Sequence, residues 1–321
     1  MPMNQTLAIR MTTLASTFLA ALALPACKKD VAHGASAAAP ASEGRAAPPA
    51  ADSAQQAEGE KLHAAIECLN WLSANIFEIR DKYLEGVDPK TGASGKTKPV
   101  MMGLRSIDPC VRDVKKAGAL KPAVTALDTA SANYASALEG FEKAYEEIKG
   151  YYAKDEQLDD KGKKARELHP KLMEAFTTFS AAHKGLSTTV RTLNRKRRET
   201  MLAAREKAEG RNLSVIMDSM MLEAETLVAL ATSNGAEVGA LDAQIASTSK
   251  LVDEVDAYAG AHKDEVRQFG SMANIKNYDK TFLAASKTVA RKLRDKGKPD
   301  DSDYEAVSNQ YNSLVTNYNN H

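Results

Sequence analysis

Cysteine is the residue type whose positions in this chain point most directly to chemistry. Cys27 ends the run Leu24 to Cys27 (LPAC), which resembles the bacterial lipobox. In that motif diacylglycerol is attached to the cysteine, and a signal peptidase then cuts on its N-terminal side. We therefore expect Cys27 to be the lipidated first residue of the mature chain, held permanently on a membrane by its acyl (palmitate-type) chains. The alternative is an ordinary secretory signal with a chance cysteine, and either interpretation exports the chain.

Two cysteines remain once Cys27 is lipidated, Cys68 and Cys110. An oxidising compartment such as the periplasm favours a disulfide between them. The enclosed loop of about 43 residues would stabilise the fold by roughly 4 kcal/mol. The alternative is two separate buried thiols.

A candidate metal site lies between Gly260 and Glu265. This segment fits the pattern Gly-x-His-x-x-Glu of imelysin-like periplasmic proteins, in which a histidine and a glutamate one helical turn apart face a metal together. His262 and Glu265 are the two candidate ligands. The rest of the chain does not resemble that family, and the alternative is a polar helix end, so no cofactor is predicted.

The loop from Gly86 to Pro99 contains the end of a phosphate-binding loop motif at Gly95 to Thr97. The first glycine of that motif is replaced by Lys90, and the loop follows a helix instead of a strand, so nucleotide binding is not predicted. We expect an exposed loop, of the kind that serves as a partner-binding surface on a rigid scaffold.

No serine, cysteine or carboxylate has the sequence context of a nucleophile or of an acid–base pair, so we do not predict an enzyme. We expect structural roles for His169 and His183, a kink or helix restart at Pro170, and core packing for the methionines near Met220. The basic run Arg195 to Arg198 is typical of a solvated, charge-laced helix, and contact with anionic lipid headgroups is the alternative.

The composition favours long helices. The chain has 321 residues, with 43 Lys+Arg against 42 Asp+Glu, and this near-neutral balance argues against a nucleic-acid binder. Aromatic residues make up 6% and alanine is abundant, which excludes an all-β protein. The predicted organisation is a signal peptide at 1–26, a lipidated, Ala/Pro-rich disordered tether at 27–58 and a helical domain at 59–321.

Apolar residues recur three and four positions apart through this last part. One stripe runs from Leu62 to Tyr83, another from Leu127 to Tyr152, and a third from Leu168 to Leu193. Further stripes follow on both sides of a break at Asn234 and Gly235. About seven long helices are expected, in an all-α, elongated antiparallel bundle.

Four segments carry a resemblance to the YiiG-like family of bacterial lipoproteins. They are 61–86 (KLHAAIECLNWLSANIFEIRDKYLEG), 151–183, 194–199 (NRKRRE) and 311–319 (YNSLVTNYN). The resemblance implies a lipobox, a low-complexity tether, an early helix with a cysteine and an all-helical domain, and it brings no established activity.

The sequence therefore predicts a lipid-anchored binding or scaffolding protein of the cell envelope. Its membrane contact is through Cys27, and a partner protein in the envelope is expected. Lys28 follows the lipidated cysteine where an aspartate would favour retention in the inner membrane, so we expect the outer membrane, facing the periplasm. The alternatives are an immunity-type lipoprotein that neutralises a toxin and an imelysin-like metal-binding protein.

Overall fold

The computed structural model describes residues 50–92, 98–233, 235–267, 272–295 and 297–319. Within these ranges the secondary structure is helical, with no strand, which confirms the all-α class. Seven helices have 19 residues or more, as the apolar stripes predicted. In chain order the helices are α2 (Ala50–Glu85), α3 (Asp108–Gly118), α4 (Thr125–Ala153), α5 (Glu156–Asp159), α6 (Lys163–Glu209), α7 (Leu213–Ala231), α8 (Val238–Ala261), α9 (Lys263–Val266), α10 (Met272–Arg294) and α11 (Asp301–Asn319).

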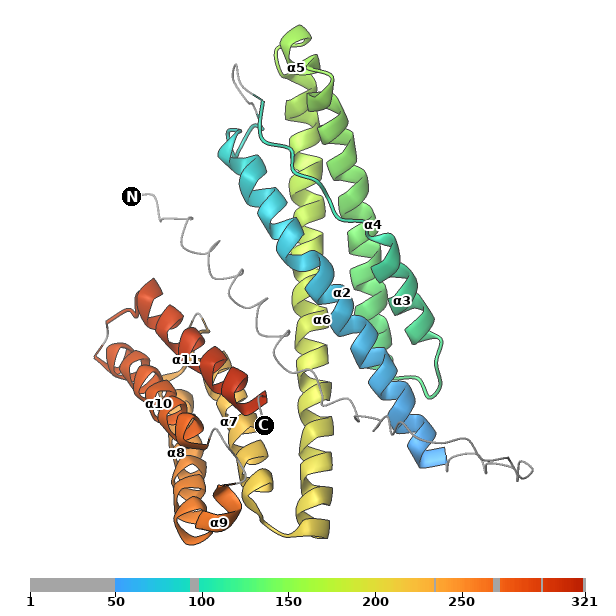
Figure 1. Cartoon of the computed structure of the whole chain (residues 1–321). Helices are drawn as coiled ribbons and strands as arrows, with labels where there is room; N and C mark the ends of the chain where they lie inside the picture. Colours follow the sequence, from blue (N-terminus) through green and yellow to red (C-terminus); the bar gives the residue numbers. More distant parts are fainter. Residues whose placement is uncertain (1–49, 93–97, 234, 268–271, 296, 320–321) are drawn as a thin grey trace, which may run out of the picture. The chain divides into compact units, whose positions relative to one another are not determined.

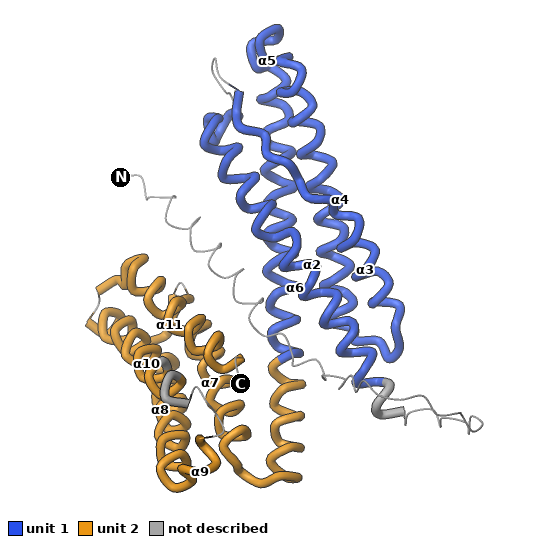
Figure 2. Tube along the Cα trace, in the orientation of Figure 1, with its two compact units in different colours: residues 1–194 blue, residues 195–321 orange. Residues whose placement is uncertain are grey.

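The chain divides into two compact units, coloured separately in Figure 2. Unit 1 ends at Asn194 and unit 2 begins at Arg195. The helix α6 is continuous through this point, so each unit contains part of it. The sequence predicted a single helical domain over 59–321, whereas the structure divides that stretch in two.

Unit 1 is built on three long helices, α2, α4 and the first part of α6, with the short α3 packed against α2 and α4 (Figure 1). Aromatic rings fill the space between the long helices. Phe179 of α6 lies with its ring centroid 5.7 Å from that of Phe77, 5.6 Å from Tyr134 and 6.0 Å from Phe141. Rings of this size keep the axes of α4 and α6 apart on the core side.

Unit 2 contains a ring of four helices. The helix α7 packs on α8, α8 on α10, α10 on α11, and α11 returns to α7. Met217, Met220 and Met221 are buried here, as predicted. The predicted break between α7 and α8 is present, and Gly235 within it has φ +89°, a conformation that glycine adopts without strain.

The first described helix begins earlier than the sequence predicted. Residues 50–58 were assigned to the tether, but α2 begins at Ala50, directly after Pro48 and Pro49. Alanine, glutamine and glutamate dominate this stretch, and all three favour helix, so helix formation does not need large apolar residues here. Residues 27–49 lie outside the described residues.

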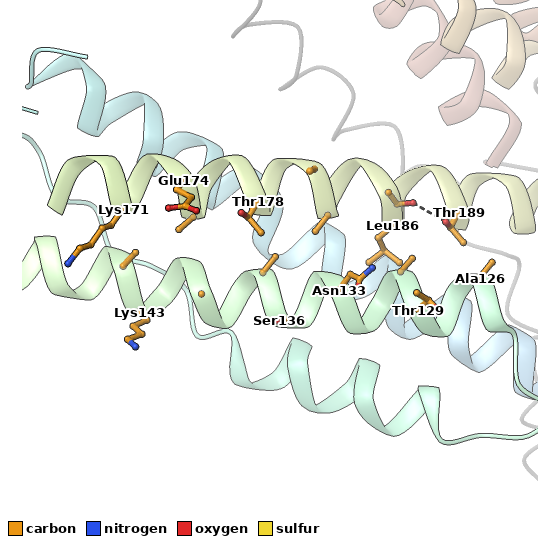
Figure 3. A pocket seen from close by; sticks show the side chains of 18 of the residues that line it. Ala126, Thr129, Asn133, Ser136, Lys143, Lys171, Glu174, Thr178, Leu186 and Thr189 are labelled. Carbon is orange, nitrogen blue, oxygen red and sulfur yellow. Dashed lines mark hydrogen bonds between the residues drawn. The ribbon is translucent and has the colours of Figure 1, made fainter. Parts of the chain in front are cut away.

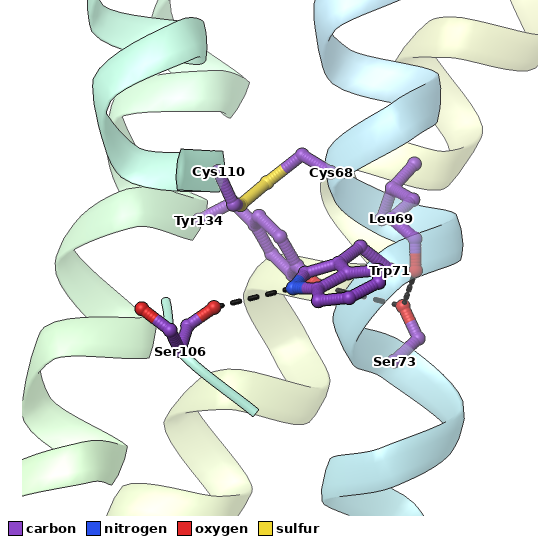
Figure 4. The surroundings of a disulfide bond; sticks show 7 residues. All are labelled: Cys68, Leu69, Trp71, Ser73, Ser106, Cys110 and Tyr134. Atoms are coloured by element: carbon purple, nitrogen blue, oxygen red, sulfur yellow. Dashed lines mark hydrogen bonds between the residues drawn. A yellow bond between two sulfur atoms is a disulfide. The ribbon is translucent and has the colours of Figure 1, made fainter. Parts of the chain in front are cut away.

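The start of α3 is fastened to α2 by a disulfide, and the segment that precedes α3 is held on α2 by side-chain hydrogen bonds (Figure 4). Cys68 and Cys110 lie at disulfide-bonding distance, with 4.8 Å between their Cα atoms, as predicted. The indole Nε1 of Trp71 donates to the carbonyl of Ser106 at 3.2 Å. The amide of Asn75 donates to the Gly103 carbonyl and accepts from the backbone N–H of Arg105. Residues 103–110 are therefore held along the surface of α2.

Candidate functional site

A long open groove runs between α4 and α6 within unit 1 (Figure 3). Its volume is about 1320 Å³. Leu186 is the only large apolar residue among those that line it; the others are mostly Ala, Gly, Ser and Thr. The lining residues are Thr125, Ala126, Thr129, Ala130, Asn133, Ser136, Ala137, Gly140, Lys143, Ala144 and Glu147 on α4, and Lys171, Glu174, Ala175, Thr178, Ala181, Ala182, Gly185, Leu186 and Thr189 on α6.

The groove follows from the distribution of large and small residues on the two helices. Tyr134, Phe141 and Phe179 point into the core and separate the helices. On the outer side the residues recur three or four apart, as Ala126, Thr129, Asn133, Ser136, Gly140 on α4, and are too short to fill the gap. Stripes of large apolar residues do not mark this face, although the helical spacing of its small residues is visible in the sequence.

Two glycines lie inside the groove, Gly140 and Gly185, in the middle of long helices. Glycine in a helix interior costs about 1 kcal/mol relative to alanine. A Cβ atom added at either position would have no atom of this chain within 4 Å. Internal packing therefore gives no reason for a glycine at either position.

Charged residues gather at one end of the groove. Lys143 and Glu147 come from α4, and Lys171 and Glu174 from α6. Figure 3 shows Lys143, Lys171 and Glu174 at the same end, away from Ala126 and Thr189. In the described part of the chain, none of these four side chains forms an ion pair. The remaining length of the groove carries no charge.

The candidate metal ligands His262 and Glu265 both contact Tyr258. His262 separates α8 from α9, so it does not share a continuous helix with Glu265 as the motif requires. The backbone carbonyl of Tyr258 lies 3.0 Å from Nδ1 of His262, and its hydroxyl donates to Glu265 at 3.0 Å. No group of three potential ligands, counted over the described ranges, is positioned to hold a metal ion.

His169 is buried and bonded at both ring nitrogens. Nε2 lies 3.0 Å from the carbonyl of Pro89, which can only accept, so the proton is on Nε2. Nδ1 then accepts from the hydroxyl of Tyr83 at 2.8 Å. The helix α6 runs through the neighbouring Pro170 without restarting, contrary to one of the two expectations for that residue.

His183 lies among the rings of Phe77, Tyr134 and Phe179. Burial lowers its pKa to about 4, so the ring is neutral at neutral pH. Both His169 and His183 therefore have the structural roles that the sequence predicted.

The described part of the loop after α2 is only partly exposed. Residues 93–97, which include the Gly-Lys-Thr sequence, lie outside the described residues. Before them, Gly92 has φ +66°, and a Cβ atom there would lie 2.2 Å from the Cβ of His169. The hydroxyl of Tyr152 also donates to the Gly92 carbonyl, so this end of the loop is packed on the bundle.

The basic run is solvated only in part: Lys196 is exposed and Arg195 pairs with Glu199 on the same helix, as the sequence predicted, whereas two of its arginines also contact α7. The helix does continue through it, but Arg195 donates to Glu223 and Arg198 to Glu225, both on α7. The side chains of Arg198 and Glu225 are only 17% and 20% exposed. The first and last residues of the run therefore fasten α6 to α7 within unit 2, and these two are not free for lipid headgroups.

The lipidation candidate Cys27 lies outside the described residues. Among the helices that the structure describes, none combines the length and the apolar character needed to cross a membrane.

Comparisons with known proteins place the chain in a family without a known function. The family described as "Protein of unknown function (DUF3829)" matches residues 56–320. The uncharacterized protein YiiG of Escherichia coli (strain K12) is 24% identical over 281 residues, which cover 81% of this chain and 78% of YiiG. No solved structure matches. These findings confirm the resemblance that the four sequence segments indicated.

Proposed function

Since this chain belongs to the DUF3829 family of proteins of unknown function, we propose its function from its own features: it is a lipid-anchored protein of the cell envelope that binds a helical partner in the groove between α4 and α6. The anchor is Cys27, and the protein acts as a binding or scaffolding module on the periplasmic face of the outer membrane.

The groove is the observation that carries the binding role. It has the form that a helix needs, since two antiparallel helices present short side chains at helical spacing along about 33 Å. Short side chains allow a third helix to approach closely, and the hydroxyl and amide groups of Thr129, Asn133 and Thr178 offer hydrogen bonds to it. The charged end supplies four side chains for ion pairs that fix orientation.

The anchoring role is supported by the sequence alone. A short apolar segment precedes the LPAC run, and the Ala/Pro-rich stretch after it provides a tether to the first described helix. Incorporation of labelled palmitate into the chain, abolished by Cys27→Ser, is the expected result. Equal labelling of the Cys27→Ser variant would contradict the anchor.

The binding role is tested by photo-crosslinking in living cells with the anchor intact. A photoreactive amino acid at Asn133 lies in the groove, and one at the neighbouring Ala132 is equally exposed but does not line it. We expect a discrete crosslinked protein band from position 133 that is absent from position 132. Bands of equal strength from both positions, or none from position 133, would reject the groove as a binding surface.

A further inference from the structure

We infer that the partner of this face is a second copy of this chain, packed with its α4 over α6 of the first copy, and its α6 over α4, about a two-fold axis parallel to both helices. This inference rests on the proposed function, because it names the partner of the same groove. It is carried by the order of the charges, by the two glycines and by the size of the face.

The charges of the two helices are complementary in their order. In the direction of α4, Lys143 comes first and Glu147 one turn later. The helix α6 runs the opposite way, so in that same direction Glu174 comes first and Lys171 follows. One helix therefore presents lysine then glutamate, and the other presents glutamate then lysine, at the same end of the groove.

A parallel two-fold axis brings these two orders together. It places α4 of one copy over α6 of the other without a shift along the helices. Lys143 then lies over Glu174 of the second copy and Glu147 over Lys171, and the symmetry repeats both pairs. All four charges that lack an ion pair within the described chain gain one. A foreign partner would need to carry this pattern independently, whereas a second copy carries it by identity.

The uncharged part of the groove suits the same arrangement. Ser136 lies opposite Thr178, and Ala126 opposite Thr189 (Figure 3). At each of these positions along the helix axes, the short side chains of one copy therefore face short side chains of the other. The glycines at 140 and 185, which nothing inside the chain explains, allow the backbones of the two copies to approach closely.

The face is large enough for a stable dimer. Its length of about 33 Å and a width of two helices, about 20 Å, give about 660 Å² per copy. The total of about 1,300 Å² lies within the range of specific protein interfaces. An axis parallel to the helices also keeps the two chains pointing the same way, which suits two chains anchored in one membrane.

The experiment uses two versions of the full-length chain with different tags, expressed together. One carries Ser136→Cys and the other Thr178→Cys, so an oxidative crosslink that joins both tags can only form between copies. We expect this crosslink. As the control, Ser136→Cys is paired with Thr189→Cys, which the arrangement places about 15 Å apart, and no crosslink is expected there. No crosslink for the first pair, or equal crosslinking of both pairs, would overturn the inference.

Charge reversal tests the pairing. Lys143→Glu should lower the crosslink yield at least fivefold, and adding Glu174→Lys to the same chain should restore it, because the reversed pair is again complementary in a dimer. Failure of the double variant to recover would overturn the inference. Gly140→Leu should also abolish the crosslink, whereas Gly150→Leu should not, since Gly150 is equally free of neighbours but does not line the groove.

The outcome also separates this inference from the proposed function. If the photoreactive group at Asn133 captures a different protein and the two tags are not joined, the groove binds a partner. In that case the inference that this partner is a second copy of the chain is wrong. If position 133 captures nothing and the tags are not joined, both are wrong.

Discussion

At the scale of single residues, Asp279 is a deeply buried carboxyl group in unit 2. Asp279 is only 1% exposed, and among the described residues neither carboxylate oxygen has a hydrogen bond of good geometry, although the backbone N–H of Lys280 partly offsets the effect of burial on the pKa. Burial raises its pKa to about 6. The nearby Asp256 adds repulsion, while it pairs with Lys276 and Lys280 at 3.1 and 2.9 Å.

This raised pKa predicts how the stability of unit 2 depends on pH. Between about pH 4 and pH 6 the folded chain holds a proton that the unfolded chain releases, so stability falls as the pH rises through this window. Above pH 6 the full destabilisation is present. Asp279→Asn should therefore raise the free energy of unfolding by about 2 kcal/mol at pH 7.5 and remove the slope.

Chemical denaturation at pH 4.5 and pH 7.5 measures this effect. Asp256→Asn is the matched control, because it removes a carboxylate that is paired, and it should destabilise instead. An unchanged pH slope in Asp279→Asn would show that the carboxyl group titrates normally.

Lys61 is buried in unit 1 and has two acceptors. Its Nζ donates to Asp128 at 2.7 Å and to the carbonyl of Gly118 at 3.2 Å. The side chain of Lys61 is 1% exposed and that of Asp128 is 23% exposed. Lys61→Met should destabilise the chain by about 2–3 kcal/mol, because it leaves both acceptors without their donor.

The double variant Lys61→Met with Asp128→Asn gives the control. It removes the unpaired charge, so part of the loss should return in thermal unfolding. A double variant that is less stable than the sum of the single changes would contradict a cost from the unpaired carboxylate.

At the scale of elements, the contact between the loop after α2 and helix α6 depends on Gly92. Its φ of +66° and the close Cβ of His169 both exclude a side chain. Gly92→Ala should therefore destabilise unit 1 by about 3 kcal/mol, and the Tyr83–His169 hydrogen bond should be lost. Gly162→Ala is the control, since its φ is +74° but the nearest atom is the flexible end of Arg166 at 3.5 Å. Gly162→Ala should lower the free energy of unfolding by about 1 kcal/mol, as measured by urea denaturation. Equal losses of stability in the two variants would show that only the positive φ matters.

The helices themselves were largely predictable, because large apolar residues at three- and four-residue spacing mark a buried face whatever it packs on. The stripes through Tyr134 and Phe179 show this. Charge patterns were less informative. The sequence cannot say that Arg198 meets Glu225, because a pair 27 residues apart depends on how α6 and α7 pack. The start of α2 was placed too late because its first turns contain helix-forming residues without a large apolar stripe.

The candidate site was predicted less well than the fold. Cys68 and Cys110 could be paired once Cys27 was assigned to the lipid anchor, because that assignment leaves two cysteines. His262 and Glu265 matched a short motif, but the helix ends between them, and a motif of three fixed positions carries no information about that. The groove could not be predicted from α4 alone, because it forms only where the small residues of α4 lie beside those of α6. The sequence does not show that these two faces are neighbours.

At the scale of the whole molecule, the two units are expected to unfold separately. The buried cluster around Leu72, Tyr134 and Phe179 is confined to residues before Asn194, while α7, α8, α10 and α11 bury their own apolar faces against one another. Unit 1 alone contains the disulfide. Units with separate cores generally unfold in separate transitions, even where one helix is continuous between them.

Hydrogen exchange along a denaturant series tests this with the two substitutions already described. Gly92→Ala should shift the unfolding midpoint of peptides from α2 and α4 and leave those from α8 and α10 unchanged. Asp279→Asn should shift the midpoint of peptides from α8 and α10 and leave those from α2 and α4 unchanged. The double variant should show both shifts, and their free energies should add to within about 0.5 kcal/mol. The helix α6 passes from one unit to the other at Asn194. Peptides of α6 before Asn194 should therefore have the unfolding midpoint of α4, and peptides after it should have that of α7. A single midpoint for all peptides, moved by either substitution, would mean that the continuous helix couples the two cores into one cooperative unit.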